Sequence, residues 1–327
     1  MSEVAFAPHP LLKSGHAQTI AAAFVPRKFD LPRAENRLFQ VDAWSKLLAQ
    51  CHWQAGKSRE APVIVIVHGL EGSCDSKYVK GIAEKVYQRG YHVVRLNQRN
   101  CGGTEGLTPT LYNSGMSGDY RMVLEELLEK DRFTQIFFVG YSMGGNLVTK
   151  MAGELGDDAP DALRGICTVC PALDLAASAE ALERRDNYLY QRHFVNGLMS
   201  RYARKARMYP ERYPRDGFGP VRTVREFDDA ITAPHFGYRD AQEYYQAAAA
   251  KRVIDQVRVP MLLITAEDDP VVPYASFLAL QLERLPSIRF NVSEHGGHCG
   301  FISRHAGGER FWAEQRIAEF CDARRKV

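Results

Sequence analysis

A serine between two glycines is the first candidate for chemistry in this sequence. Gly140, Ser142 and Gly144 form a Gly-x-Ser-x-Gly motif, with the apolar run 136–139 before it and a helical pattern after it. A strand that turns this sharply into a helix needs glycine beside the serine, and the turn exposes the serine hydroxyl. The spacing predicts that Ser142 is a nucleophile, although a glycine-rich turn without chemistry has the same short signature.

A nucleophilic serine needs a base that takes its proton and an acid that orients the base. In a parallel sheet these groups follow later strands, in the order serine, acid, histidine. Asp269 follows the expected strand 259–265, and His298 follows the expected strand 288–292. We therefore expect Asp269 to be the orienting acid and His298 to be the base.

Each of these two loops contains a second candidate. Asp269 directly precedes the Pro-Val-Val-Pro segment that leads to the next helix, and its neighbour Asp268 is the alternative acid. His298 lies further from its strand than His295 and follows two glycines, which would let it reach back over the sheet edge.

The negative oxygen of a tetrahedral intermediate needs backbone N–H donors. Met143 follows the serine at the start of the helix, so we expect its N–H to be one donor. The second donor should come from the turn His68-Gly69-Leu70, with Leu70 the better placed. We expect His68 to brace this turn rather than transfer protons.

The elements that hold these residues alternate between strand and helix. Continuous β-branched runs such as 62–67 are typical of strands buried on both faces, whereas 37–41 and 47–53 alternate like two antiparallel strands. The remaining expected strands are 91–96, 136–139 and 163–169. The expected helices are 76–88, 119–130, a helix that follows the Ser142 turn and runs to Leu155, 274–285 and 310–325.

This order predicts an α/β protein with a mostly parallel, doubly wound sheet. Between the sixth and seventh major strands the pattern is helical only. We therefore expect a core of residues 1–170 and 252–327, with an N-terminal arm and a hairpin, and a helical cap insertion of residues 171–251.

Composition narrows the classes of function. No apolar run approaches the roughly 20 residues that span a membrane, and no basic and then apolar leader opens the chain. The seven cysteines lack the spacing of a disulfide framework, so we expect reduced thiols in the cytoplasm and a packing role for Cys167 and Cys170. Neither metal-ligand spacing nor a dinucleotide fingerprint is present, so a reaction without cofactor or metal is expected.

The net charge of +3 is unevenly distributed. Residues 180–225 contain eleven Lys and Arg against five acidic residues, an excess of +6. We expect a solvated helical face here, and attraction of an anionic substrate or lipid surface is the alternative. The sequence has no nucleic-acid-binding motif.

Further motifs run from near the start of the chain to near its end. They are Gly15-His16-Ala17-Gln18-Thr19, His68-Gly69-Leu70-Glu71-Gly72-Ser73, Asn97-Gln98-Arg99-Asn100-Cys101-Gly102-Gly103, Gly140-Tyr141-Ser142-Met143-Gly144-Gly145-Asn146, Glu226-Phe227-Asp228-Asp229, Tyr244-Tyr245, Asp268-Asp269-Pro270 and Gly296-Gly297-His298-Cys299-Gly300-Phe301. On these motifs the chain resembles the α/β-hydrolase superfamily, and more narrowly its YheT-like branch, related to a plant embryo protein and to vertebrate membrane-associated hydrolases.

The resemblance implies the α/β-hydrolase fold, a triad of Ser142, Asp269 and His298, and esterase or acyltransferase-like activity on an acyl ester. Asn100 departs from the branch, which usually has glycine after the arginine. Asparagine tolerates left-handed backbone angles better than most residues.

Our leading expectation is a serine esterase acting on small-molecule acyl esters, lipids among them, bound between the sheet edge and the helical insertion. The expected acyl pocket draws on Tyr188, Tyr190, Phe194, Met199 and Tyr202, unless these side chains are simply core. Acyl transfer to an alcohol or phospholipid, with peripheral membrane contact, is one alternative. A non-catalytic binding protein is another.

Overall fold

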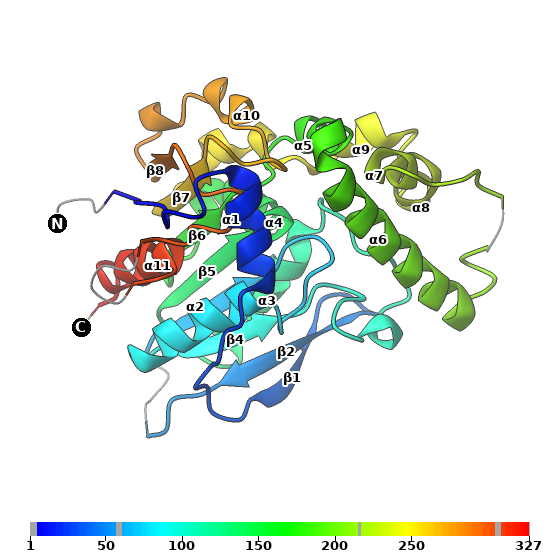
Figure 1. Ribbon diagram of the computed structural model, residues 1–327. Helices are drawn as coiled ribbons and strands as arrows, with labels where there is room; N and C mark the ends of the chain where they lie inside the picture. Colours follow the sequence, from blue (N-terminus) through cyan, green and yellow to red (C-terminus); the bar gives the residue numbers. More distant parts are fainter. Residues whose placement is uncertain (1–4, 57–60, 215–216, 305–308, 327) are drawn as a thin grey trace.

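One eight-stranded sheet forms the centre of the protein (Figure 1). The computed structural model describes residues 5–56, 61–214, 217–304 and 309–326. The strands lie in the order β1-β2-β4-β3-β5-β6-β7-β8, and β2 pairs antiparallel with β1 and β4, whereas all pairs from β4 to β8 are parallel. Their bounds are β1 Glu35–Gln40, β2 Lys46–His52, β3 Val63–Val67, β4 His92–Leu96, β5 Ile136–Tyr141, β6 Leu163–Val169, β7 Met261–Ala266 and β8 Ile288–Ser293. The predicted hairpin and mostly parallel sheet are confirmed.

Helices cover both faces of this sheet. On one face, α2 (Lys77–Gln88) and α11 (Trp312–Asp322) pack against strand residues such as Ile64. On the other face, α3 (Ser117–Glu129) and α4 (Met143–Leu155) pack against strand residues such as Val65. Every residue of β3 is buried because its two faces meet these two layers, which explains its unbroken apolar sequence.

One predicted helix is interrupted. Residues 274–285 form a short α10 (Ala275–Leu278) and a separate 3-10 turn, Leu282–Arg284. Gln281 lies between them with a left-handed φ of 47°, which a right-handed helix cannot continue through. The break places Leu282 in the core, where it is 1% exposed.

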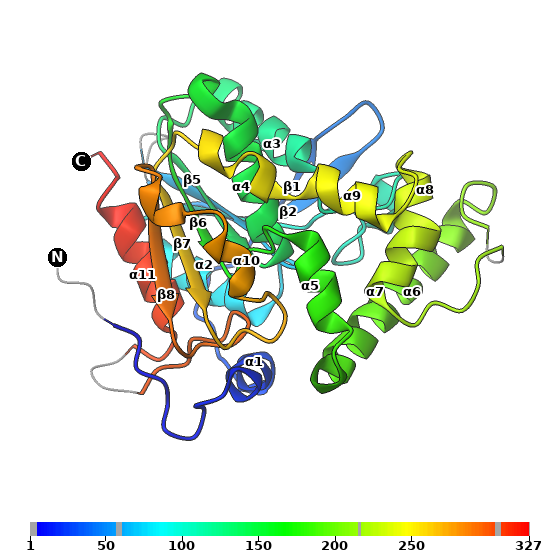
Figure 2. The same ribbon diagram turned by 90° about the horizontal axis from the view of Figure 1, so that it is seen from above.

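The described residues between β6 and β7 form helices joined by loops, without a strand, and we call residues 171–251 the helical insertion. Its helices are α5 Leu175–Leu182, α6 Tyr188–Met208, α7 Val224–Phe227, α8 Ala233–His235 and α9 Ala241–Ala248, with a π-helical turn at Asp228–Thr232. Figure 2 shows α5, α6, α7 and α8 gathered on one side of the molecule, away from α11 and both chain ends. The division of the chain into a core domain and a cap domain stays a prediction.

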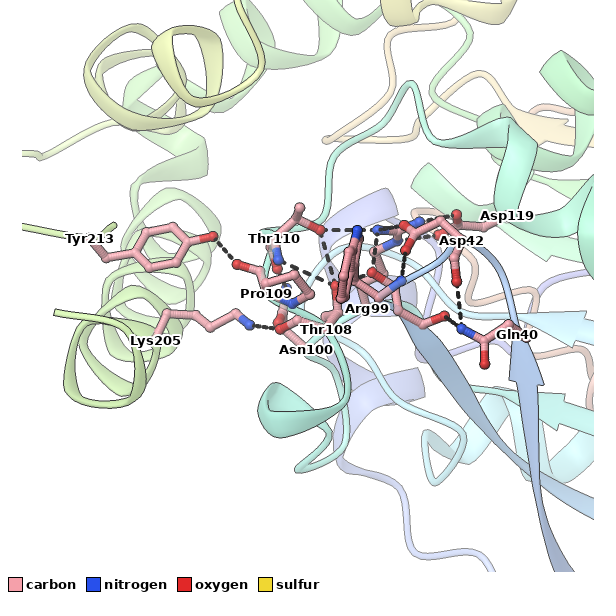
Figure 3. A network of polar contacts seen from close by, with 12 residues as sticks. Gln40, Asp42, Arg99, Asn100, Thr108, Pro109, Thr110, Asp119, Lys205 and Tyr213 are labelled. Carbon is pink, nitrogen blue, oxygen red and sulfur yellow. Dashed lines mark hydrogen bonds and ion pairs between the residues drawn. The ribbon is translucent and has the colours of Figure 1, made fainter. Parts of the chain in front are cut away.

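The basic segment is not only a solvated face, which corrects the expectation. Two cations of α6, Arg201 and Lys205, are 6% and 0% exposed. Lys205 Nζ donates to the Glu105 carbonyl at 2.8 Å. It also donates to the Thr108 carbonyl (Figure 3), so the buried ammonium group is paired with loop carbonyls. This burial lowers the pKa of Lys205 to about 8. Arg215 and Asp216 of the segment lie outside the described residues.

The expected N-terminal arm contains a helix, α1 (Gly15–Phe24), capped by the Ser14 side chain, which accepts a hydrogen bond from the Ala17 N–H. Among the described residues, no helix is long and apolar enough to cross a membrane. The seven cysteines are free, and Cys167 and Cys170 are buried as expected.

Candidate active site

Ser142 lies in a strained turn between β5 and α4. Its φ of 53° and ψ of −119° are backbone angles that side chains rarely adopt. A Cβ added to Gly140 would lie 2.4 Å from the Gly144 carbonyl oxygen, and a Cβ on Gly144 would lie 2.4 Å from the His68 carbonyl oxygen. Both positions therefore require glycine. This explains why glycines lie on both sides of Ser142, whose backbone stays outside the helix.

The structure brings the three residues predicted for the site into one chain of contacts. His298 Nε2 lies 2.9 Å from Ser142 Oγ, and His298 Nδ1 lies 2.8 Å from Asp269 Oδ2. The Asp269 side chain is fully buried, and its Oδ1 accepts hydrogen bonds from the N–H groups of Val271 and Val272. These contacts orient the imidazole with one nitrogen toward the serine hydroxyl.

Two opposing effects set the charge preference of His298. Burial lowers its pKa, but Asp269 and, to a smaller extent, Cys170 together outweigh burial and raise the pKa to about 10. The Asp269 carboxylate therefore stabilises the imidazolium form, which a base reaches when it takes a proton.

The alternative residues Asp268 and His295 lie beside each other instead. His295 Nδ1 is 3.4 Å from Asp268 Oδ2, and Asp268 Oδ1 accepts from the Gly297 N–H at 2.8 Å. Burial raises the pKa of Asp268. Asp268 thus supports the loop that carries His298, and the imidazole of His298 contacts Asp269.

The turn after β3 approaches the serine closely. A Cβ on Gly69 would lie 3.1 Å from Ser142 Cβ, and Leu70 and Met143 both line the cavity next to Ser142. The N–H of Met143 is the first of α4, where helical N–H groups have no partner within the helix. The positions of these two residues suit the predicted oxyanion donors, whose role stays a prediction.

His68 has the contacts of a brace. It is fully buried, its Nε2 accepts from the Gln98 N–H at 3.1 Å, and its Nδ1 lies 2.8 Å from the Gly69 carbonyl oxygen. Burial lowers its pKa to about 4, so the ring is neutral and its two hydrogen bonds hold the turn.

A buried ion pair, which sequence reasoning missed, joins this turn to the helical insertion. Glu71 Oε2 lies 3.0 Å from Arg201 Nη2, and the Tyr112 hydroxyl donates to Glu71 Oε1 at 2.7 Å. Arg201 Nη1 also donates to the carbonyl of Asn100, whose φ of 63° is the left-handed conformation that asparagine tolerates. Glu71 and Arg201 are 130 residues apart, and no local pattern links them.

A mainly apolar cavity opens beside Ser142. Among the five insertion residues proposed for an acyl pocket, Phe194 and Tyr202 line it, whereas Tyr188 is 60% exposed and Tyr190 stacks on His16. Helical spacing did not show which side of α6 faces the serine. Other apolar residues complete the wall, including Leu175, Leu182, Leu198, Val224, Phe227 and Val271.

One acidic residue also lines this cavity. Asp228, at the start of the π-helical turn, accepts a hydrogen bond from the Tyr245 hydroxyl at 2.7 Å. Burial raises the pKa of Asp228 to about 6. Asp228 is thus one of several polar residues in a mainly apolar wall, together with Asn113, Ser178, Arg201 and Thr232.

Two thiols lie beside the histidine. Ligand atoms of Cys170, His298 and Cys299 are all within 4.8 Å of one another, the one group in the described part of the chain that could hold a metal ion. Sequence spacing did not reveal it because Cys170 follows β6 and the other two follow β8. The same histidine also contacts Asp269 and Ser142.

Helix α1 also reaches the site, which the sequence did not predict. The side-chain oxygen of Thr19 accepts a hydrogen bond from the backbone N–H of His298 at 2.8 Å. The Gly-His-Ala-Gln-Thr motif near the start of the chain is the signal that could have pointed there.

Comparisons with known proteins support the fold. Residues 62–304 match the model of the family described as "alpha/beta hydrolase fold". The chain is 31% identical to "Putative esterase YheT" of Escherichia coli K12, over 98% of this chain and 93% of that protein. It is 27% identical to "Medium-chain fatty acid ethyl ester synthase/esterase 2" of Saccharomyces cerevisiae, over 91% and 71%. An esterase structure from Pyrococcus furiosus shares the fold, with a TM-score of 0.58 and 13% identity, over 92% and 99%.

Proposed function

The chain belongs to the α/β-hydrolase family, and from this premise we propose that it is a serine hydrolase that cleaves carboxylic esters. The observation that carries the proposal is the chain of contacts from Ser142 through His298 to Asp269. Relatives named as esterases and lipases support a hydrolase of this general kind.

In the proposed reaction, the Ser142 oxygen attacks the ester carbonyl carbon while His298 Nε2 accepts the hydroxyl proton. Asp269 holds the imidazole in the tautomer with a free Nε2 and stabilises the imidazolium. The N–H groups of Met143 and Leu70 stabilise the negative oxygen of the tetrahedral intermediate.

Collapse of this intermediate breaks the ester C–O bond, and the alcohol leaves with the proton from His298. Water then attacks the acyl-enzyme, with His298 as base again, and releases the acid. The strained backbone of Ser142 supports this role because it holds the hydroxyl at the cavity wall, within reach of His298.

The cavity supports an ester with an apolar acyl group. Its walls next to Ser142 are mostly aliphatic and aromatic side chains from the helical insertion, such as Leu198 and Phe227. Burial of each methylene of an acyl chain in such walls stabilises binding by about 0.8 kcal/mol. Fatty-acyl esters are therefore the substrate class that this site fits best.

The test is the variant Ser142→Ala assayed with p-nitrophenyl esters of increasing acyl length. We expect kcat/KM to fall about 10⁴-fold or more, because the remaining groups include no nucleophile. Ser200→Ala is the control, since Ser200 lies on α6 and bonds only to the Arg204 side chain among the described residues. Undiminished activity in Ser142→Ala would remove the assignment, and an inactive wild type would favour a binding protein.

Acyl transfer to an alcohol is a second candidate for the same site. The observation in its favour is the yeast relative, whose name includes both ester synthase and esterase. An alcohol in place of water at the acyl-enzyme would form a new ester by the same steps. Product analysis with a medium-chain ester and added ethanol or glycerol tests this, because free acid as the sole product would exclude transfer to these alcohols.

A further inference from the structure

We propose that helix α1 is a positioning element for the base His298, and that the Thr19 hydroxyl is the group through which it acts. The proposal rests on the proposed function, since it assigns a cause to the placement of the imidazole that function requires. It also accounts for the Gly-His-Ala-Gln-Thr motif, which has no part in the proposed chemical steps.

Thr19 fixes the backbone of His298 directly. Its Oγ1 accepts from the His298 N–H at 2.8 Å and donates to the Gly15 carbonyl oxygen at 2.7 Å. With its proton committed to Gly15, the hydroxyl presents its lone pairs to the histidine. The hydrogen bond therefore defines where the backbone of His298 lies relative to α1.

The first turn of α1 also packs against both loops that carry the acid and the base. A Cβ on Gly15 would lie 1.7 Å from the Asp268 carbonyl oxygen, in the loop that contains Asp269. In the loop that contains His298, a Cβ on Gly297 would lie 2.3 Å from the Gly15 carbonyl oxygen. Backbone contact this close leaves neither loop room to move toward α1.

Gln18 anchors the far end of the histidine loop. Its side chain is fully buried, with Nε2 donating to the Ile302 carbonyl at 3.1 Å and Oε1 accepting from the Ile302 N–H at 2.8 Å. Its Nε2 also donates to the Leu12 carbonyl at 2.8 Å, which connects this contact to the segment that precedes α1. Thr19 and Gln18 together hold the loop at His298 and at Ile302.

The loop needs such external contacts because its own backbone is strained. Positive φ values occur at Gly296, Gly297, Cys299 and Phe301, of 152°, 57°, 60° and 43°. Glycine adopts this conformation freely, but side chains rarely do, so Cys299 and Phe301 carry backbone strain that persists only where the surroundings enforce it. Among these surroundings, α1 forms a hydrogen bond to the backbone of the base His298 itself.

Thr19 acts on the base and not on the substrate. It is not among the residues that line the cavity beside Ser142. Loss of its hydroxyl should therefore change the chemical step and leave substrate binding alone, which separates a positioning role from a binding role.

The experiment compares Thr19→Val, which keeps the side-chain shape and removes the hydroxyl, with Thr19→Ser, which keeps the hydroxyl. Thr149→Val is the matched control, because Thr149 also donates to a glycine carbonyl four residues earlier, at 2.8 Å, but makes no bond to His298. Each variant is assayed for kcat and KM on one ester. Amide hydrogen exchange of a peptide that covers residues 295–301 provides a readout independent of activity.

We expect Thr19→Val to lower kcat 10- to 100-fold with KM unchanged within about twofold, since a displacement of about 1 Å costs this much. Exchange in residues 295–301 should accelerate in Thr19→Val only, and Thr19→Ser should retain most of the wild-type kcat. Thr149→Val should stay within about twofold of wild type.

Unchanged exchange and kcat in Thr19→Val, or a rise in KM alone, would overturn the positioning role. A wild type without ester hydrolysis, combined with faster exchange in Thr19→Val, would refute the proposed function and retain the control of the loop by α1. If Thr19→Val does not fold, Thr19→Ala replaces it. Its comparison with Thr19→Ser again tests the effect of the hydroxyl.

Discussion

Both carboxylate oxygens of Asp269 face the imidazole of His298, but only one of them also bonds to the backbone. Oδ2 lies 2.8 Å and Oδ1 lies 3.1 Å from His298 Nδ1, and Oδ1 accepts from two backbone N–H groups as well. The backbone bonds therefore fix the carboxylate while Oδ2 makes the shorter contact with the imidazole. The neighbouring Asp268 instead bonds to Gly297 and lies near His295, so the two acids differ in their contacts although they are adjacent in sequence.

Exchange of each acid for its amide tests this difference. Asp269→Asn should lower kcat by about 10³- to 10⁴-fold, because the amide neither stabilises the imidazolium nor enforces the correct tautomer. Asp268→Asn should lower kcat less than about tenfold, since an amide oxygen can still accept from Gly297. Steady-state kinetics on variants with unchanged thermal unfolding provide the measurement, and equal losses in both would contradict the assignment of the acid.

The raised pKa of His298 gives a prediction for the pH profile. The base must be neutral to take a proton, so kcat/KM should fall as pH drops through the pKa of the free enzyme. Asp269 and Cys170 raise this pKa to about 10, so the midpoint of the acid limb should lie well above pH 6.5. Measurement of kcat/KM from pH 5 to 11 checks it, and a midpoint below 6.5 would be inconsistent with stabilisation of the imidazolium by these neighbours.

Among the elements, α6 makes the polar contacts that join the helical insertion to the turn after β3. Arg201 and Glu71 have side chains only 7% and 8% exposed, and Gly197 lets α6 approach because its Cβ would lie 2.4 Å from the Glu71 carboxylate. This pair also steadies the turn that carries Leu70. Removal of one partner leaves a buried charge without compensation.

Arg201→Met should therefore reduce the free energy of unfolding by about 3 kcal/mol. The double variant Glu71→Gln and Arg201→Met should lose less than the sum of the two single changes, because it leaves no unpaired charge. Urea unfolding of the four proteins measures this coupling. Strictly additive losses would show that the two groups do not stabilise each other.

The sequence was informative about the position of a residue where a single strand determines that position. Ser142, Asp269 and His298 each follow a strand of the sheet, so the order of strands was enough to predict that they meet. The break at Gln281 lies within a helical pattern and has no marker of its own. Contacts between distant segments, such as Thr19 with His298 and Glu71 with Arg201, depend on packing that no local sequence pattern indicates. The face of α6 that lines the cavity also depends on such packing, so the sequence did not indicate that Leu198 lines it.

At the scale of the molecule, the cavity lies where the helical insertion meets the loops at the carboxyl edge of the sheet. Its walls come from α5, α6, α7 and the turn after α7, whereas Ser142 and Met143 come from the sheet side. Figure 2 shows the insertion helices on one side of this sheet. The proposed chemistry and the proposed choice of acyl group thus draw on different parts of the fold.

A bulkier side chain on α5 should shorten the acyl chains that the site accepts. Ala179 lines the cavity and is 4% exposed, so Ala179→Phe would fill space that an acyl chain requires. We expect kcat/KM for long-chain esters to fall at least tenfold relative to acetate or butyrate esters. A chain-length series of p-nitrophenyl esters tests it, and a uniform loss at every length would indicate that the acyl chain lies elsewhere.

Labelling with a fluorophosphonate most directly tests the central claim that Ser142 is an activated nucleophile. We expect one phosphonate adduct per folded chain, mapped to Ser142 by peptide mass spectrometry and absent from the Ser142→Ala variant. Asp269→Asn should label much more slowly than wild type. A folded wild-type protein that remains unlabelled, or an adduct that persists in Ser142→Ala, would contradict the account.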